Sequence, residues 1–221
     1  MTSTELPLLS DPCAWLVAHG SSCAELFGFI TGVLNVWLVT RENIWSWPLG
    51  VLNAGFYIVV FARTGLYSDT GLQVVYLVLS LYGWWHWLRG APSRGGPSHD
   101  GPSHDAVVVT RTPRRMAVIM AAIALVSWLT LATITRRLPG AALPWLDAAL
   151  VSISLVAQYM MTRKLLENWL LWIAVDVVYI GLFINRQLPL TALLYAVFLV
   201  LAIIGYVQWH RSAARTRLAN A

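Results

Sequence analysis

The chain is built of successive apolar runs, and the short segments between them carry Arg, Pro, Gly or Asn. Most runs approach the roughly 20 residues that an α-helix needs to cross the hydrocarbon core of a bilayer. The pattern therefore predicts an all-α membrane protein with seven transmembrane helices. We place them near residues 22–40, 44–62, 66–88, 115–135, 143–162, 168–185 and 188–210.

The composition supports this prediction. Of 221 residues, 58% are hydrophobic and 11% are charged, whereas about a quarter of the residues in a soluble domain are charged. Seven helices leave no room for a second soluble domain. The two cysteines, Cys13 and Cys23, form no CxxC motif and no Cys/His cluster. We therefore expect neither a metal site nor a cofactor.

Basic residues distinguish the two sides of the membrane. One side holds four arginines, namely Arg63, Arg136, Arg137 and Arg186. The other side holds Arg41, Arg89, Arg94, Arg111, Arg114, Arg115, Arg163, Lys164, Arg211, Arg215 and Arg217. The positive-inside rule then places the N-terminal segment 1–21 outside and the tail 211–221 in the cytoplasm. We attribute the net charge of +5 to this asymmetry, and we expect no nucleic-acid partner.

The connection 89–113 differs from the others because it is rich in Gly, Pro and Ser and contains GPSHD twice in tandem. His99 and His104 could belong to a metal patch or a docking site. A flexible linker between two helical bundles is the alternative that we favour, because such a segment would not fix the geometry of the two histidines.

The sequence contains an internal repeat. ENIWSW at Glu42–Trp47 matches ENWLLW at Glu167–Trp172 with an offset of 125, and VWLVTR at Val36–Arg41 matches QYMMTR at Gln158–Arg163 with an offset of 122. We infer two three-helix bundles in parallel orientation.

In this 3+1+3 arrangement the bundles span 22–88 and 143–210, and the helix 115–135 connects them. Parallel repeats of this kind place a substrate at the interface between the halves, near the bilayer midplane. They are more typical of a transporter than of a scaffold.

Polar side chains form stripes on several predicted helices. In the third helix, Asp69, Gln73, Tyr76, Ser80, Gly83 and Trp87 recur at alternating spacings of four and three. In lipid such a face must turn inward, because each unsatisfied polar group costs several kcal/mol. We interpret Gln73, Tyr76 and Tyr195 of the last helix as ligand contacts, and Ser80, Gly83 and Gly205 as helix-packing positions.

Asp176 lies near the middle of its predicted span, on the same face as Trp169 and Trp172. An intramembrane carboxylate is costly and points to function, although a structural hydrogen bond to a neighbouring helix is the alternative. In the second helix Asn53 shares the inward face, and Trp47 recurs beside polar residues. The role of Asn35 stays open. Four tryptophans near helix ends are interpreted as interfacial belts, namely Trp84, Trp85, Trp87 and Trp209.

Four functional classes are compared. A transporter for an aromatic, hydroxyl-bearing solute fits the Trp, Tyr, Gln, Asn and Asp side chains. An intramembrane enzyme lacks support, because the chain has no GxSxG, no HExxH and no paired acid motif, so we assign no catalytic residue. A retinal photoreceptor requires a buried lysine, yet Lys164 lies in a predicted loop. An ion channel stays an open alternative, but the sequence shows neither a charged ring nor a filter loop.

Specific motifs resemble the PnuC family of bacterial vitamin transporters. They are WSWPLG at Trp45–Gly50, LYSDTGLQ and YGWW within Gly65–Trp87, ENWLLWIAVD at Glu167–Asp176, and LTALLYAVFLVLAIIGYVQW at Leu190–Trp209. The resemblance covers about residues 25–88 and 145–210. It implies a fold similar to full-length SWEET sugar transporters, a homotrimer in the bacterial inner membrane, and no cofactor.

The resemblance also implies the substrate. Members of the family take up nicotinamide riboside by facilitated diffusion, and a cytoplasmic kinase traps the product. Relatives carry thiamine or riboflavin, so another vitamin, or a sugar, is the alternative. The family motif positions carried onto this chain are Trp47, Asn53, Gln73, Tyr76, Trp169, Trp172, Asp176 and Tyr195. Trp172 or Trp47 would stack the pyridinium, Gln73 or Asn53 would bind the carboxamide, and Asp176 would bind the ribose hydroxyls or the positive charge.

Overall fold

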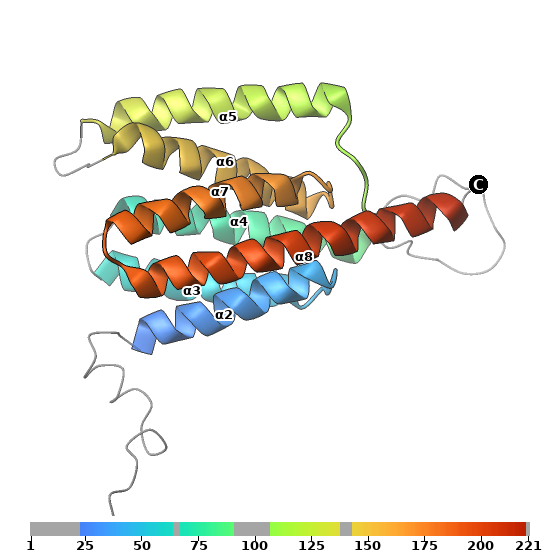
Figure 1. Ribbon diagram of the computed structural model, residues 1–221, viewed down its shortest axis with the longest axis horizontal. Coiled ribbons are helices and arrows are strands. Elements are labelled where there is room, and N and C mark those ends of the chain that lie inside the picture. Colours follow the sequence, from blue (N-terminus) through green and yellow to red (C-terminus); the bar gives the residue numbers. More distant parts are fainter. Residues whose placement is uncertain (1–22, 64–66, 91–106, 138–142, 220–221) are drawn as a thin grey trace, which may run out of the picture.

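The structure is a computed structural model that describes residues 23–63, 67–90, 107–137 and 143–219. Its regular elements in these ranges are α-helices at the seven predicted places, with labels as in Figure 1. They are α2 (Cys23–Thr40), α3 (Ser46–Arg63), α4 (Tyr67–Arg89), α5 (Arg114–Thr135), α6 (Pro144–Thr162), α7 (Asn168–Asn185) and α8 (Pro189–Ala219).

Proline marks where four of these helices begin. Pro144 and Pro189 are the first residues of α6 and α8, Pro48 lies in the first turn of α3, and Pro113 is the residue before α5. Proline lacks a backbone N–H, but the first N–H groups of a helix have no intrahelical acceptor, so nothing is lost at these positions. The starts of these four helices therefore coincide with prolines in the sequence.

Six helices form a closed ring. Each of α2, α3, α4, α6, α7 and α8 contacts the next in this order, and α8 packs against α2. The helix α5 lies outside the ring and, among the described helices, contacts only α6 (Figure 1). Successive helices run in alternating directions. Because α3 and α7 are separated by two helices on either side of this ring, they lie on opposite sides of its centre.

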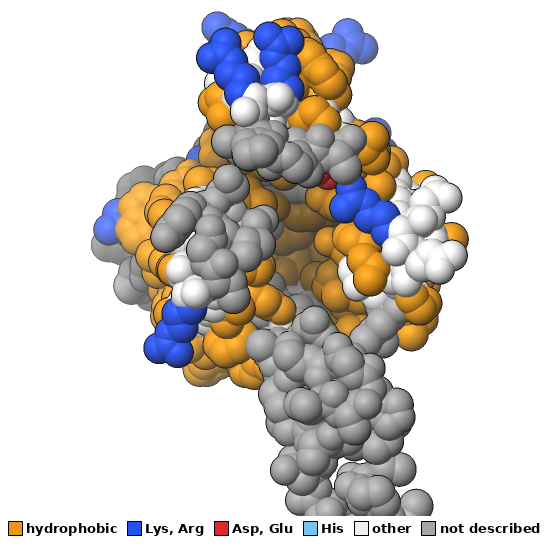
Figure 2. Space-filling view, turned by 90° about the vertical axis from the view of Figure 1, so that its left-hand side faces the viewer, with side chains coloured by type: hydrophobic (Ala, Val, Ile, Leu, Met, Phe, Trp, Pro, Cys, Tyr) orange, Lys and Arg blue, Asp and Glu red, His pale blue; other side chains and the backbone are white. Residues whose placement is uncertain are grey.

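The two ends of the ring differ. Figure 2 looks onto the end where α3, α5 and α7 terminate, and its centre is hollowed, so we call it the hollow end. Arg63 is the last residue of α3, and Arg136, Arg137 and Arg186 follow the ends of α5 and α7; basic side chains are visible around the rim. The opposite end, where α2 and α6 terminate, is filled by indole side chains described below, and we call it the indole end.

The surface fits a lipid environment. Large exposed apolar side chains occur on all seven described helices, and Figure 2 shows them around the periphery. By length and composition, four helices in the described ranges can cross a membrane unaided, namely α5, α6, α7 and α8; Phe27–Thr40 is apolar but shorter. The structure thus has helices at all seven predicted places, and four of them have the length and composition of a membrane span. Polar side chains that face the interior lower the apolar character of α3 and α4.

Two segments differ from the prediction. The helix α8 does not end at 210 but continues to Ala219, because Ala, Arg and Leu favour helix after the apolar run has ended. The last part of the predicted linker, residues 107–112, is packed, and we call it the strap. Val109 of the strap is buried in the same cluster as Ala213 of α8. The GPSHD repeats lie outside the described residues.

Candidate functional site

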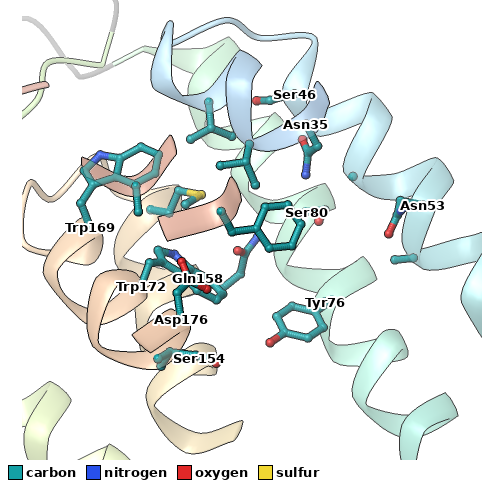
Figure 3. A pocket seen from close by; sticks show the side chains of 18 of the residues that line it. Asn35, Ser46, Asn53, Tyr76, Ser80, Ser154, Gln158, Trp169, Trp172 and Asp176 are labelled. Carbon is teal, nitrogen blue, oxygen red and sulfur yellow. The ribbon is translucent and has the colours of Figure 1, made fainter. Parts of the chain in front are cut away.

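A cavity of about 380 Å³ occupies the centre of the ring, within the range of about 300–1,000 Å³ that small-molecule sites occupy. All six ring helices contribute side chains to it, whereas α5 contributes none. In Figure 3, Gln158 lies beside Trp172 and Asp176 on one side of the cavity, and Tyr76, Ser80 and Asn53 lie on the other. The cavity therefore lies between the first three described helices and the last three.

The structure brings all eight sequence-predicted site residues to this cavity. They come from four different helices and are Trp47, Asn53, Gln73, Tyr76, Trp169, Trp172, Asp176 and Tyr195. The inward turn of polar faces in lipid is the physical reason that sequence spacing could find them.

Two glycines let indole rings close one end of the cavity. A Cβ built on Gly83 would collide with the Trp47 ring, and one on Gly205 would lie 2.5 Å from the Trp169 ring. Only glycine permits such close approach, so both positions serve helix packing as the sequence predicted. Ser80, which was also assigned to packing, is buried beside Gly50 of α3 and lines the cavity as well.

Four indoles form a continuous layer, which we call the indole floor and which consists of Trp47, Trp87, Trp169 and Trp209. The ring centroids of Trp47 and Trp87 lie 5.2 Å apart with the planes at 81°, and those of Trp169 and Trp209 lie 5.3 Å apart at 86°. Trp87 and Trp209 complete the layer at 6.3 Å. Edge-to-face pairs of this kind are favourable beyond the area they bury.

The assignment of Trp87 and Trp209 to an interfacial belt is wrong. Trp209 has no exposed surface, and its Nε1 donates to the carbonyl of Val39 at 3.1 Å. Trp87 is buried, and its Nε1 donates to the carbonyl of Thr162 at 3.1 Å. Both bonds join the first three helices to the last three. The two carbonyl acceptors come within reach of the indoles only when the ring has folded. Trp85, by contrast, is exposed, as a belt position requires.

Among the described residues, Asp176 alone brings formal charge into the cavity. Asp176 is 3% exposed, and no Lys, Arg or His of the described ranges lines the cavity. A buried carboxylate without a cationic neighbour is costly, and a cationic or hydroxyl-rich ligand lowers that cost. The cavity therefore suits cations and polar neutral molecules and disfavours anions.

Aromatic side chains cover the cavity wall beside Asp176. The ring of Tyr195 lies 4.6 Å from that of Tyr179 and 5.3 Å from that of Phe183. On the opposite side, the amide nitrogen of Asn53 donates to Thr31 Oγ1 at 2.6 Å, which ties α3 to α2. The Asn53 amide nitrogen is thus already engaged within the protein.

Sequence reasoning missed several polar lining residues, namely Ser154, Gln158 and Tyr179, and left Asn35 undecided. Tyr179 lies three residues after Asp176, on the face that Trp172 already marked, so the spacing could have found it. Ser154 and Gln158 are four residues apart on α6, so they lie on one face of that helix, and the same spacing argument applies to them. The Oδ1 atom of Asn35 is buried without a hydrogen-bond partner in the described structure.

The arrangement is suited to binding rather than to bond cleavage. The described lining residues combine indoles, phenols, amides and one carboxylate, and none of them is a cysteine or a histidine. Among the described residues, no group of three His, Cys, Asp or Glu side chains could hold a metal ion.

Comparison with known proteins agrees with this chemistry. A family described as nicotinamide mononucleotide transporter matches residues 22–211. The nicotinamide riboside transporter PnuC of Escherichia coli (strain K12) is 28% identical over 207 residues, covering 87% of each chain. The riboflavin/roseoflavin transporter RibM of Streptomyces davaonensis (strain DSM 101723 / JCM 4913 / KCC S-0913 / 768) is 26% identical over 189 residues, covering 84% of each chain.

A solved structure shares the fold. The crystal structure of the vitamin B3 transporter PnuC superimposes with a TM-score of 0.67 at 24% sequence identity, covering 95% of this chain and 86% of that one. The resemblance read from the sequence motifs is thereby confirmed. The family consists of transporters rather than enzymes, and this chain is a multi-pass membrane protein that belongs to the nicotinamide mononucleotide transporter family.

Proposed function

We propose that the protein carries nicotinamide riboside across the bacterial inner membrane. The observation that carries this proposal is the cavity itself, in which Asp176 is the one formally charged side chain among the described lining residues, and aromatic rings line the same cavity. Nicotinamide riboside combines a flat cationic pyridinium with a carboxamide and ribose hydroxyls. Each of these groups has a matching side chain in the cavity, and several relatives are named as transporters of this compound.

The charge of the cavity favours the riboside over the mononucleotide. The mononucleotide adds a phosphate, and anion recognition ordinarily uses Arg, Lys or the backbone N–H groups at a helix N-terminus. Within the part of the chain that the structure describes, no basic side chain lines this cavity, and the carboxylate of Asp176 would repel a phosphate. The riboside carries no anionic group and avoids this repulsion.

The roles that we assign to individual cavity side chains follow from how exposed each one is and from the hydrogen bonds it already makes within the protein. We assign pyridinium stacking to Trp172, because Trp47 is almost fully buried against Gly83 and Trp87. A cation over an indole gains about 0.5–2 kcal/mol. We assign the carboxamide to Gln73, since the amide nitrogen of Asn53 is bound to Thr31. Asp176 would offset the positive charge of the ring.

We further propose that the two halves are a parallel repeat. Trp47 and Trp169, Gly83 and Gly205, and Trp87 and Trp209 make matching contacts, and each pair is 122 positions apart. This offset pairs Trp47 with Trp169, so it is preferred over the offset of 125, which would pair Trp47 with Trp172. Alternating access then consists of rocking one half against the other around the cavity.

The proposed direction follows the positive-inside rule. The arginine-rich indole end would face the cytoplasm and the hollow end would face the outside, so this conformation would load substrate from outside. Facilitated diffusion needs no ion or nucleotide, and phosphorylation of the riboside by a cytoplasmic kinase would keep the gradient inward. Assembly as a homotrimer is part of the same proposal and is supported by the family resemblance.

Riboflavin is the second candidate substrate, because one relative of similar identity is named as a riboflavin/roseoflavin transporter. Riboflavin is flat and rich in hydroxyls but carries no positive charge. Thiamine, which is cationic, and sugars are further alternatives. The charge of Asp176 favours the cationic solutes.

Calorimetry on the purified protein in detergent tests the substrate directly. We expect saturable binding of nicotinamide riboside, with no competition from riboflavin, thiamine or nicotinamide mononucleotide at equal concentration. Uptake of the riboside into proteoliposomes without ATP or an ion gradient tests the transport mode. Binding of riboflavin or thiamine in place of the riboside would retain a transporter and discard the proposed substrate.

A further inference from the structure

One ion pair joins the two halves at the indole end. Lys164 Nζ lies 2.7 Å from Glu42 Oε2, and the two side chains are 7% and 24% exposed. Glu42 belongs to the turn after α2, and Lys164 belongs to the turn after α6. Lys164 Nζ also lies 4.3 Å from the centroid of the Trp87 ring. The pair therefore sits directly against the indole floor.

Both residues occupy backbone positions that favour glycine. The φ angles of Glu42 and Lys164 are 52° and 49°, in the left-handed region. Each closes its helix with the same pair of bonds, from Glu42 N to Val39 O and Asn43 N to Leu38 O in the first turn. This is the Schellman arrangement, in which glycine is the usual residue at the left-handed position.

Keeping a charged side chain at a left-handed position carries a steric cost that glycine avoids. Such a cost is tolerated in this fold, since Gln187 also has a left-handed φ, so what distinguishes Glu42 and Lys164 is the contact between their side chains. The two residues are 122 positions apart, so they are equivalent positions of the proposed repeat. Equivalent positions with identical residues would bring like charges together, whereas here the charges are opposite and attract.

The strap fixes the backbone of the lysine. Thr110 N donates to the carbonyl of Lys164 at 3.1 Å, and Leu166 N donates to the carbonyl of Thr110 at 2.9 Å. Thr112 donates to Glu167 Oε2 through its backbone N–H at 2.8 Å and through its hydroxyl at 2.6 Å. These bonds fix the backbone of the turn after α6. They connect the strap, which belongs to the linker between the two halves, to Lys164, which bridges the halves.

We propose that Glu42 and Lys164 form a lock that holds the indole end closed, and that the strap positions Lys164 for it. The inference rests on the proposed alternating access, because the indole end must open in one stage of that cycle. Breaking the ion pair would weaken the closure of this end while leaving the cavity residues in place.

The test measures access to a buried position below the floor. Thr40 is 1% exposed and does not line the cavity, so a cysteine there is reached only when the indole end opens. The reporter is Thr40→Cys in a chain that carries Cys13→Ser and Cys23→Ser. The readout is the rate of labelling by a membrane-impermeant maleimide in proteoliposomes that expose the indole end.

We expect Lys164→Gly to raise the labelling rate about fivefold or more, the lower end of typical conformational coupling. Glu42→Gln, which keeps the shape of the side chain, should act in the same direction. The charge exchange Glu42→Lys with Lys164→Glu should restore slow labelling. The matched control is Gln187→Gly, which relieves a left-handed residue (φ 58°) in the turn after α7, at the hollow end. It should leave the rate unchanged.

The proposal is overturned if both single variants label as slowly as the parent chain. It is also overturned if the exchanged pair labels as fast as the single variants, because the charges would then not act together. Labelling reports conformation and needs no substrate. A failure of nicotinamide riboside to bind in calorimetry therefore tests the proposed substrate and leaves the lock to be judged on its own data.

Discussion

Replacing Asp176 by asparagine should separate charge recognition from shape recognition in the cavity. The change keeps the size of the side chain and removes its negative charge. The structure sets the scale of the effect, because a sphere of about 380 Å³ has a radius of about 4.5 Å. A ring bound in this cavity thus lies on the order of 6 Å from the carboxylate. At an effective dielectric of about 20, that separation corresponds to roughly 3 kcal/mol.

This energy predicts a roughly hundredfold weaker affinity of Asp176→Asn for nicotinamide riboside. The reduced 1,4-dihydro form of the riboside is a near-isosteric ligand with an uncharged ring, and its affinity should change much less. Calorimetric titration of both ligands against both proteins forms a thermodynamic cycle, and its coupling energy isolates the charge interaction.

Asp147→Asn is the matched control, because Asp147 is exposed in the first turn of α6 and does not line the cavity. Asp147→Asn should bind both ligands with the same affinities as the parent chain. If Asp176→Asn weakened both ligands equally, Asp176 would act through hydrogen bonds or packing, and the assignment of the pyridinium charge to it would be refuted. An unchanged affinity for both ligands would remove Asp176 from the site.

Two further predictions concern indoles and glycines. Trp172→Ala should weaken riboside binding about 2- to 30-fold, the equivalent of 0.5–2 kcal/mol, with modest loss of thermal stability. Trp47→Ala should chiefly lower the melting temperature, because Trp47 belongs to the floor; equal loss of affinity at near-normal stability in both variants would contradict the separate roles. Gly205→Ala should destabilise the protein, since the new Cβ would stand 2.5 Å from the Trp169 ring and overpacking costs about 1–3 kcal/mol. Gly181→Ala meets nothing within 4 Å and should leave the melting temperature equal or higher in scanning fluorimetry; a rise for Gly205→Ala would show that the floor yields easily.

Much of the site could be predicted because the bilayer restricts where polar groups can go. Gln73 and Tyr76 lie three residues apart on a helix that must bury its polar face, so their inward direction follows from helical periodicity. The same reasoning placed Trp172 and Asp176 on one inward face. Tyr179 and Gln158 carry the same kind of signal and were within reach of it.

Other features depend on contacts that no local pattern encodes. The acceptor for the Trp209 indole is the Val39 carbonyl, which lies 170 positions away in the sequence. Trp209 is therefore buried although it stands near the end of an apolar run, where an interfacial position is typical. Lys164 was placed in a loop from its neighbours, and its ion pair with Glu42 joins turns 122 positions apart.

The sequence by itself determined the places of the helices, eight of the cavity residues and the family, because apolar run length, inward polar faces and motif spacing are local properties. The tertiary structure decided which aromatic residues belong to the floor and which remain available to a ligand, and it decided that Glu42 and Lys164 meet. Their meeting requires two helix ends from different halves to be brought together in the ring. Packing between distant segments is a property of the whole fold, and the periodicity of a single helix does not contain it.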